Sequence, residues 1–397
     1  MNAFRTLDHA DMKGKRVLVR ADLNVPVENG VVSDATRIER MAPAILEIAG
    51  KGAKVILLSH FGRPKGRDPK QSLKPVAAEV AHTLKRPVKF VDDCIGEAAE
   101  RAVAAMHPGD ILCLENTRFH AGEEENDPKF VAALAKLGDI FVNDAFSVSH
   151  RAHASTEGLA HVLTAYAGRT LQAELEAFEK VLDKPARPLT AIVGGAKIST
   201  KLDLLGHLLK RVDVLIIGGA MANTFLLALN KRIGKSLAER DLIKTAQKIM
   251  DEAKRANREI VLPVDAVVAE KFEAHAPSRV VDVDHVGDND MMLDIGPRSI
   301  EQAVSVLARS KTLVWNGPFG AFEMEPFDTG TIEVAEAAAE LTAAGKLVSV
   351  AGGGDTVAAL NVAGVVDRLS YVSTAGGAFL EWLEGKALPG VEVLRVR

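Results

Sequence analysis

The sequence has few of the features that mark secreted, disulfide-stabilised or membrane proteins. It contains 2 cysteines in 397 residues, Cys94 and Cys113, each within or at the end of an apolar stretch. One disulfide fits that count, but we expect two buried free thiols because nothing else suggests export. No apolar run approaches the roughly 18 residues of a membrane helix, and the first residues lack the apolar core of a signal peptide. We therefore expect a cytoplasmic protein with no membrane partner.

A large positive charge is also missing. The formal net charge is −4, which argues against a nucleic-acid partner bound through bulk charge. The chain exceeds what one hydrophobic core usually organises, and 47% of its residues are apolar. We therefore expect two domains, each with its own core.

Apolar runs rich in Val, Ile and Leu alternate with segments of helical period in both halves of the chain. This alternation is typical of βαβ units, and continuous apolar strands indicate sheets covered on both faces. We predict an α/β fold with two doubly wound, Rossmann-like parallel-sheet domains. Helices are predicted at 34–49, 75–85 and 239–257, whereas 264–310 is less regular and 286–299 is loop-like.

The segment 168–188 separates the two halves. Its apolar residues recur at intervals of 4, 3 and 4, which is a helical pattern: Leu171, Leu175, Phe178 and Leu182. Thr170 is the predicted N-cap, and Pro185 follows the last turn. The alternative is one more crossover helix within a domain. The predicted organisation is an N-terminal domain at 1–167, a hinge helix at 168–185, and a C-terminal domain at 186–397 whose final residues either stay there or pack back on the N-terminal domain.

Apolar runs in the first 155 residues end in charged or hydrogen-bonding side chains. Ligands of open α/β sheets bind outside the carboxyl ends of the strands. Arginine suits phosphate and carboxylate because its planar fork donates two parallel hydrogen bonds. For any one arginine a surface salt bridge is the simpler interpretation, but several at equivalent positions predict a ligand with more than one anionic group. The candidates are Asp22, Asn24, Arg37, His60, Arg63, Arg118 and Arg151.

This half contains two further groups of polar residues. Asp22 and Asn24 either orient a ligand hydroxyl, or Asp22 pairs with an arginine and holds it. His120, His150 and His153 cannot all bind a ligand, so one or two of them are expected to pack or to be solvated. No His, Cys and carboxylate group shows metal-ligand spacing, so no metal is expected among these residues.

Apolar runs in the second half end in glycine instead. In GGAKISTK, Gly194 and Gly195 precede Lys197 and Lys201, which we expect on one face of a helix. Glycine-rich turns that open a helix present backbone N–H groups to phosphate. Neither GxxxxGK[ST] nor GxGxxG occurs, so neither a P-loop NTPase nor a Rossmann dehydrogenase is supported.

Three more residues complete this second set. In AGGGDT, Asp355 and Thr356 fall at a predicted helix start, where a carboxylate could bind Mg²⁺ beside substrate phosphates or simply cap the helix. Glu323 follows a tight Gly/Pro turn and is a candidate for ribose hydroxyls. Nothing suggests a covalent nucleophile, and phosphoryl transfer needs none, because positioning and charge neutralisation do most of the work.

The chain resembles the phosphoglycerate kinase family, bacterial type, through eight motifs in order: RADLNVP, LLSHFGRPKG, LENTRFHAGEE, VNDAFSVSHRAHAS, GGAKISTK, LVWNGPFGAFE, AGGGDT and STAGGA. The resemblance runs from about residue 16 to 390. It implies a phosphotransferase with a carboxyl group as acceptor, acting in glycolysis and gluconeogenesis. The implied reaction is reversible, Mg²⁺-dependent transfer between 1,3-bisphosphoglycerate with ADP and 3-phosphoglycerate with ATP, in line and after domain closure. A monomer is expected from the resemblance alone.

The resemblance also implies residue roles. For the three-carbon acid it implies Asp22, Asn24, Arg37, His60, Arg63, Arg118 and Arg151. For the nucleotide it implies Gly194, Gly195, Lys201, Gly219, Asn316, Pro318, Glu323, Gly352, Gly353, Gly354, Asp355 and Thr356, with Asp355 on the metal. For catalysis it implies Arg37, Lys197, Lys201, Gly354, Gly376 and Gly377.

One motif departs from the family pattern. The usual STGGGAS is here STAGGAF, so Ala375 replaces the first glycine. A position that needed a positive φ would be strained by a Cβ; because two glycines follow, we expect activity to be kept. Two other functions remain: a different ATP-dependent carboxylate kinase, which would turn over another acid, and a two-domain anion-binding module without turnover.

Overall fold

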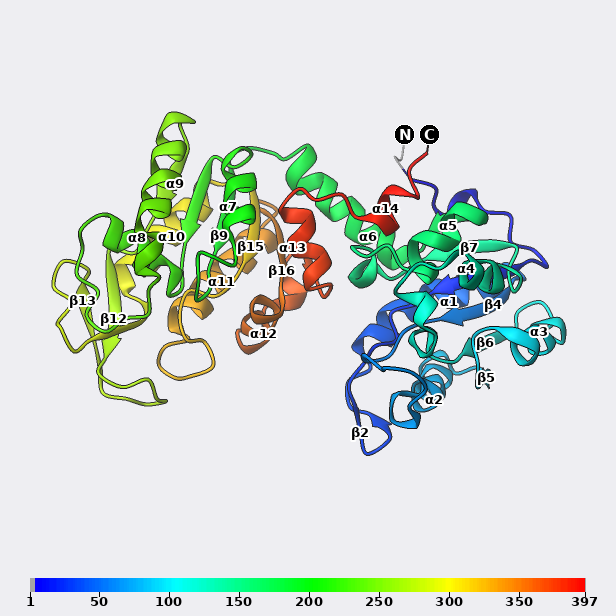
Figure 1. Ribbon diagram of the computed structural model, residues 1–397. Helices are drawn as coiled ribbons and strands as arrows, with labels where there is room; N and C mark the ends of the chain where they lie inside the picture. Colours follow the sequence, from blue (N-terminus) through cyan, green and yellow to red (C-terminus); the bar gives the residue numbers. More distant parts are fainter. Residues whose placement is uncertain (1–3, 397) are drawn as a thin grey trace. The chain divides into compact units, whose positions relative to one another are not determined.

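Each half of the polypeptide forms its own parallel β-sheet with helices on both faces (Figure 1). A computed structural model describes residues 4–396. The chain divides into two compact units. The first runs to Leu175 and includes the C-terminal segment from Ala387 onward, and the second is Glu176–Lys386. Fold class is therefore as predicted: two doubly wound α/β domains.

The first unit contains a six-stranded sheet of order β5-β6-β4-β1-β7-β8, parallel throughout. Strands β4, β5 and β6 lie on one side of β1, and β7 and β8 lie on its other side. The topological switch point is therefore between β1 and β7. The strands are β1 Arg16–Arg20, β4 Lys54–Leu58, β5 Val88–Val91, β6 Ile111–Leu114, β7 Ile140–Asn143 and β8 Thr164–Ala167. A hairpin of β2 Val27–Glu28 and β3 Val31–Val32 precedes the first helix.

Helices connect these strands. The α-helices are α1 Thr36–Gly50, α2 Lys74–Leu84, α3 Gly96–Ala104, α4 Pro128–Ala135, α5 Leu159–Val162 and, at the end of the chain, α14 Pro389–Glu392. Single helical turns are η1 Leu7–His9, η2 Pro69–Gln71, η3 Thr117–Phe119, η4 Ala121–Glu123, η5 Phe146–Val148 and η6 Ala154–Gly158. The predicted helices at 34–49 and 75–85 are confirmed to within two residues.

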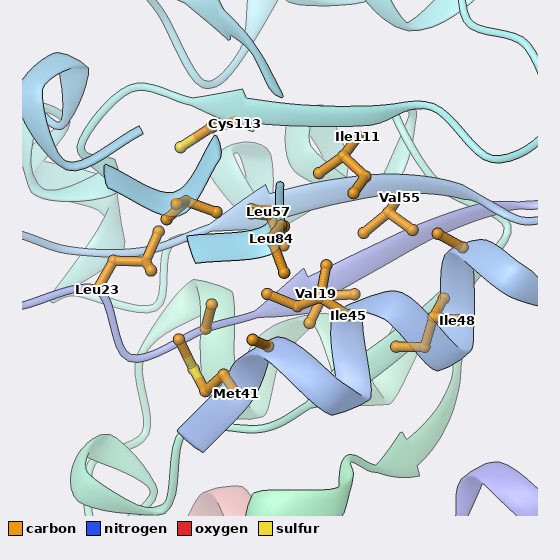
Figure 2. Close-up of a cluster of buried hydrophobic side chains, with 14 of the residues drawn as sticks. Val19, Leu23, Met41, Ile45, Ile48, Val55, Leu57, Leu84, Ile111 and Cys113 are labelled. Atoms are coloured by element: carbon orange, nitrogen blue, oxygen red, sulfur yellow. The ribbon is translucent and has the colours of Figure 1, made fainter. Parts of the chain in front are cut away.

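The core of the first unit lies between the sheet and its helices. Figure 2 shows Ile45 and Ile48 of α1 pointing toward Val19, Val55 and Leu57 of the sheet. These five side chains are buried, and each contributes about 1.5–3 kcal/mol when removed from water. This packing holds the strand ends in fixed positions. Both cysteines are buried free thiols, as expected.

The second unit contains a six-stranded parallel sheet of order β11-β10-β9-β15-β16-β17, with its switch point between β9 and β15. Its strands are β9 Leu189–Val193, β10 Val214–Ile217, β11 Glu259–Val261, β15 Thr312–Asn316, β16 Val348–Gly352 and β17 Tyr371–Ser373. Its α-helices are α7 Leu202–Leu209, α8 Met221–Ala228, α9 Ile243–Arg255, α10 Pro297–Arg309, α11 Thr329–Ala343, α12 Gly354–Val362 and α13 Gly377–Leu383, with single turns η8 Arg240–Leu242 and η9 Val366–Arg368.

The prediction for the irregular stretch 264–310 was wrong in part. It contains a three-stranded antiparallel sheet of order β13-β12-β14, followed by α10. The strands are β12 Asp265–Ala269, β13 Ser278–Asp282 and β14 Met291–Ile295. Strand β14 lies inside the segment expected to be a loop. Its turn-forming neighbours hid it, because β14 gains its stability from pairing with β12 over 20 residues away rather than from a local pattern.

The segment between the two halves is helical, but it does not begin as predicted. Helix α6 spans Arg169–Phe178 and continues as a π-helical turn, η7 Glu179–Asp183. Thr170 is inside the helix and is not its N-cap. The carboxylate of Asp144, just after β7, accepts hydrogen bonds from the backbone N–H groups of Thr170 at 2.7 Å and Leu171 at 3.0 Å. The cap therefore comes from a distant strand end, which local sequence does not reveal.

The boundary between the two units, Leu175 to Glu176, falls within α6. At its start, Arg169 pairs with Asp8 at 2.7 Å and with Glu47 at 2.7 Å in the first unit. At its end, the ring of Phe178 stacks on Trp382 of the second unit with centroids 4.2 Å apart. The C-terminal segment returns to the first unit, where Asn143 Nδ2 donates to Gly390 O at 3.0 Å. Within the residues described, no helix is both long and apolar enough to cross a bilayer.

Candidate active site

The polar side chains of the first unit gather at the carboxyl edge of its sheet, around the switch point. Because the strands are parallel, residues that follow β1, β4, β6 and β7 share this edge. Every predicted anion-binding residue but one follows such a strand; Arg37 enters from the first turn of α1. The fold therefore brings the predicted set to a single edge.

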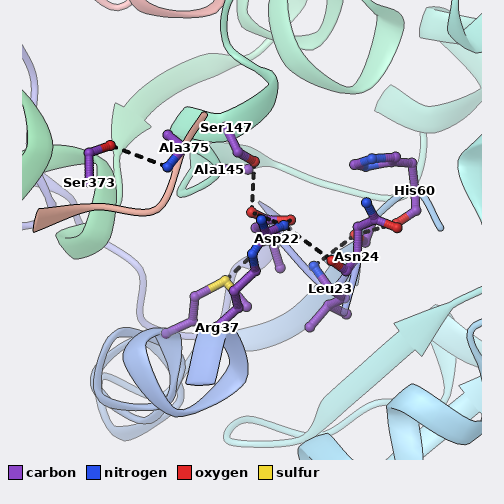
Figure 3. Close-up of polar contacts among 12 residues, drawn as sticks. Asp22, Leu23, Asn24, Arg37, His60, Ala145, Ser147, Ser373 and Ala375 are labelled. Carbon is purple, nitrogen blue, oxygen red and sulfur yellow. Dashed lines mark hydrogen bonds and ion pairs between the residues drawn. The ribbon is translucent and has the colours of Figure 1, made fainter. Parts of the chain in front are cut away.

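Arg37 is held by the residues that follow β1 (Figure 3). Its NH1 group donates to Asp22 Oδ2 at 3.1 Å and to the carbonyl oxygen of Asn24 at 3.1 Å. Ser147 Oγ donates to the same Asp22 oxygen at 2.7 Å. The interpretation that Asp22 pairs with an arginine is therefore confirmed. Arg37 remains one-third exposed, so part of its fork faces solvent.

His60 is oriented by a buried chain of polar groups. Arg20 donates from NH2 to His60 Nδ1 at 3.0 Å and from Nε to Ser155 Oγ at 2.8 Å. Ser155 in turn donates from Oγ to Glu123 Oε1 at 2.5 Å. Burial and the neighbouring arginines hold the pKa of His60 well below its usual value, so the ring is neutral.

Gly62 links two of the predicted residues. Its N–H donates to Asn24 Oδ1 at 2.9 Å, and its carbonyl oxygen accepts from Arg118 NH1 at 2.7 Å. Arg118 is 8% exposed, and burial lowers its pKa. Arg63 is exposed at the same edge, and Arg151 donates from Nε to His150 Nε2 at 3.2 Å.

The remaining histidines differ in environment. His120 is hydrogen-bonded to Asp93 Oδ1 at 2.8 Å, and its ring stacks on Phe130. His153 is buried, and burial with nearby arginines lowers its pKa to about 4. Asp93, Cys94 and His120 form a spatial group of metal-ligand type that their sequence spacing does not show.

In the second unit, the glycine-containing loops that follow β9, β10 and β15 pack closely against one another at the switch point. The Gly194 N–H donates to Asn316 O at 2.9 Å. A Cβ on Gly194 would lie 2.0 Å from Pro318 O, and one on Gly219 would lie 2.5 Å from Gly195 N. Only glycine fits these positions, so a ligand here meets backbone rather than side chains.

Lys201 is the cation buried at this junction. Its Nζ donates to Gly194 O at 2.6 Å and to Asn316 Oδ1 at 2.5 Å, and burial lowers its pKa to about 8. The prediction that Lys197 and Lys201 share a helix face was wrong, because α7 begins only at Leu202. Lys197 lies exposed in the turn before the helix, since the glycine pair extends the loop.

The 352–356 loop opens α12 as predicted. Gly353 has φ +99°, and α12 begins at Gly354 with Asp355 exposed in its first turn. Asn316 Nδ2 donates to Gly352 O at 2.7 Å, and Thr356 Oγ1 accepts from the Gly317 N–H at 2.7 Å. These bonds join the loops after β15 and β16.

A cavity of about 460 Å³ opens beside these loops. Its wall includes several residues predicted for a nucleotide: Gly195, Gly219, Pro318, Glu323 and Asp355. Apolar side chains such as Leu226 and Phe319 line it too, as is usual for a cavity that accepts a planar organic ligand. The exposed carboxylate of Asp355 on this wall is the hard oxygen ligand that Mg²⁺ prefers beside phosphates.

The loop containing Ala375 is unstrained at that residue. Ala375 N–H donates to Ser373 Oγ at 3.2 Å (Figure 3). Within residues 4–396, non-glycine residues with positive φ are Asn29, Lys85, Asn126, Asn230, Asn257 and His275, and Ala375 is not among them. The next residue, Gly376, has φ +46°, and Gly377 begins α13. The backbone at position 375 therefore does not require glycine, and alanine fits there without strain.

Four residues that support the first edge were not among the predicted site residues: Arg20, Ser147, Ser155 and Glu123. Arg20 carried a usable signal, because an arginine at the end of an apolar strand must be buried or functional. The two serines and Glu123 carried no such signal, because their hydrogen-bond partners lie more than 30 residues away in the sequence.

One unit carries a cationic side-chain edge, and the other carries a glycine-walled cavity with Lys201 and Asp355. This combination is typical of an α/β phosphotransferase. A sequence profile described as phosphoglycerate kinase matches residues 7–386. The chain belongs to the phosphoglycerate kinase family, and it is an enzyme of the kinase type.

Similar proteins cover the whole chain. A phosphoglycerate kinase of Rhodopseudomonas palustris is 66% identical over 394 residues, with 99% of each chain covered. One of Bradyrhizobium diazoefficiens is 64% identical over 396 residues, with 100% of each covered. The solved structure of phosphoglycerate kinase from Coxiella burnetii has a TM-score of 0.92 at 42% identity, with 98% of each chain covered.

Proposed function

We propose that the chain catalyses reversible phosphoryl transfer between 1,3-bisphosphoglycerate with ADP and 3-phosphoglycerate with ATP. The observation that carries this proposal is the opposite chemistry of the two strand edges. One presents arginines and a neutral His60, which suit an acid with two anionic groups. The other presents bare backbone and a cavity, which suit a nucleotide.

On the first edge, the three-carbon acid binds the polar side chains gathered there. The guanidinium groups of Arg63, Arg118 and Arg151 donate hydrogen bonds to its phosphate and carboxylate. His60 donates from Nε2 to a ligand oxygen, since its Nδ1 already accepts from Arg20. Asn24 and Asp22 position Arg37 as well as the ligand.

On the second edge, the nucleotide lies in the cavity against the loops at Gly195, Gly219 and Pro318, with Glu323 at the ribose. Asp355 would hold Mg²⁺, which neutralises phosphate charge when bound. Lys201 stays largely protonated at neutral pH, because its pKa is about 8. It holds the loops of Gly194 and Asn316 in place and contributes positive charge to the phosphates.

The transferring phosphoryl group needs charge neutralisation from both sides. Arg37 supplies it from the acid side. Lys197 and the backbone N–H groups at Gly354, Gly376 and Gly377 supply it from the nucleotide side. Transfer is direct and in line, because positioning with electrostatics is sufficient for this chemistry and no covalent carrier is needed.

We propose that α6 and its π-helical turn act as the hinge through which the two units approach when both ligands are bound. The support is that the helix starts in contacts of the first unit and ends in contacts of the second. Closure would also exclude water, which hydrolyses acyl phosphates. Small-angle scattering tests this: the radius of gyration should fall only with both ligands present, and an unchanged radius would refute the hinge.

We also propose that the chain works as a monomer in the cytoplasm, because each predicted site is completed by residues of one chain. Light scattering after size exclusion tests whether the chain is a monomer.

Calorimetry with each ligand alone tests the assignment of the two sites. Arg118→Ala should weaken 3-phosphoglycerate binding and leave MgADP binding intact, whereas equal loss of both would contradict two separate sites.

A further inference from the structure

Three side chains of different ligand type meet at the carboxyl ends of β5 and β6. Asp93 and Cys94 follow β5, and His120 ends the turn after β6. One ligand atom from each lies within 4.8 Å of the other two. We propose that Asp93, Cys94 and His120 bind a thiophilic divalent cation of the zinc class. This site is separate from Asp355, which belongs to the other unit.

The donor set favours such an ion over magnesium. A thiolate and an imidazole select zinc-like ions, whereas Mg²⁺ takes oxygen ligands and keeps its waters. Three protein ligands leave the fourth tetrahedral position to water. Asp93 is 33% and His120 is 32% exposed at the side chain, so an ion and its water reach the group from solvent.

Two of the ligand atoms are already close to the required spacing, and the third lies within 4.8 Å of both. Bonds of about 2.0–2.3 Å to a tetrahedral ion place neighbouring ligand atoms roughly 3.3–3.7 Å apart. His120 Nε2 and Asp93 Oδ1 are 2.8 Å apart and hydrogen-bonded, so the ion replaces the hydrogen between them and moves them apart by less than about 1 Å.

The surroundings hold two of the ligands in place. The ring of His120 stacks on Phe130 with centroids 5.2 Å apart. Asp93 Oδ1 accepts from the backbone N–H of Cys94 at 2.7 Å, and Asp93 Oδ2 lies 3.8 Å from Arg67 NH1. Such outer contacts orient metal-ligating side chains.

The proton balance of binding is defined. The Cys94 thiol loses its hydrogen as the metal–sulfur bond forms, and this proton passes to the buffer. Imidazole binds through a lone pair of its neutral form, so the hydrogen that His120 Nε2 shares with Asp93 moves to Nδ1. Asp93 binds as the carboxylate. One proton is therefore released per ion bound, and no oxidation or reduction takes place.

Cobalt(II) titration of the reduced, chelator-treated full chain tests the proposal, because a thiolate on Co²⁺ gives a sulfur-to-metal absorption band in the near ultraviolet. We expect this band to saturate at one ion per chain and to persist in excess Mg²⁺. Calorimetry with Zn²⁺ in two buffers of different ionisation enthalpy should report about one proton released per ion.

Three variants separate the proposed site from adventitious binding. Cys94→Ser should abolish the band. His120→Gln, at a partly exposed side chain, should weaken Co²⁺ binding at least 10-fold. Cys113→Ser is the matched control, because Cys113 is the other buried thiol and lies within the apolar core of Figure 2; it should keep the band. The proposal is overturned if no band forms, if Cys94→Ser keeps it, or if His120→Gln binds Co²⁺ as tightly as the unmodified chain.

Discussion

Arg20 lies 3.0 Å from His60, with its guanidinium NH2 group against Nδ1 of the ring. A guanidinium can only donate, so Nδ1 must accept and the hydrogen must be on Nε2. Arg20 is 1% exposed and is fixed in turn by Ser155. His60 therefore presents a neutral N–H donor to the edge where the phosphoglycerate is proposed to bind.

This arrangement predicts a specific pH response. His60 should remain the neutral Nε2–H form well below pH 6.5, because burial and nearby arginines depress its pKa in the folded state. In the unfolded chain a histidine titrates near 6.5, so the unfolded state binds more protons below that pH and stability should fall as pH falls through it. His153, with a pKa of about 4, adds to the same trend.

Nitrogen-15 spectra of the imidazoles between pH 5 and 8 provide the measurement. The His60 signals should keep the Nε2–H pattern over the whole range. Urea unfolding over the same range should show lower stability at pH 5 than at pH 7, and this slope should be reduced in His153→Gln. The control His107→Gln changes an exposed ring and should leave the slope unchanged. Titration of His60 near 6.5 would contradict the account.

Replacing Arg37 by alanine should reduce kcat far more than it weakens nucleotide binding. Arg37 is preorganised by Asp22 and Asn24, and loss of one such donor typically costs roughly 10²–10³ in rate, about 3–4 kcal/mol. Steady-state kinetics and MgADP calorimetry provide the two values. Arg37→Lys keeps the charge but not the planar guanidinium, so its kcat should lie between that of the unmodified chain and that of the alanine variant. An unchanged kcat in the alanine variant would leave Arg37 with a positioning role only.

Replacing Asp355 by alanine should weaken Mg-nucleotide binding and leave 3-phosphoglycerate binding nearly unchanged. The carboxylate is exposed on the cavity wall, so its removal should not disturb the core. Calorimetry with each ligand separately measures the difference. Asp355→Asn keeps the shape without the charge and should show most of the same loss. Equal losses for both ligands would mean that the substitution acts by unfolding the loop.

Two substitutions in the last motif should have opposite consequences. Ala375→Gly should leave kcat within about twofold and cost only about 0.5–1 kcal/mol through chain entropy, because Ala375 has no positive φ. Gly376→Ala should cost roughly 1–3 kcal/mol and reduce kcat, because Gly376 has φ +46° and ψ −102°. Urea unfolding and steady-state kinetics distinguish them. A large gain in activity from Ala375→Gly would show that the family glycine is needed here.

Much of the architecture followed from sequence because its signals are local. Continuous apolar strands and helical periods predicted both parallel sheets, and the residues after each strand end necessarily shared one edge. The errors came from long-range effects. Strand β14 depends on pairing with β12, and the start of α6 depends on the carboxylate of Asp144, which lies more than 20 residues upstream.

The candidate site shows the same division. Arg37, Arg118 and the glycine loops were predictable from type and position. The chain from Glu123 through Ser155 and Arg20 to His60 was not, because its hydrogen bonds join residues that only the fold brings together. The group formed by Cys94 and His120 was hidden for the same reason.

We propose that an acid bound by side chains in one unit receives a phosphoryl group from a nucleotide bound to backbone in the other. A coupled assay of the purified chain with ATP and 3-phosphoglycerate, with and without Mg²⁺, tests it most directly. The account predicts turnover that requires all three components and disappears with a chelator. Turnover of another carboxylic acid with none of 3-phosphoglycerate, or no turnover at all, would contradict it.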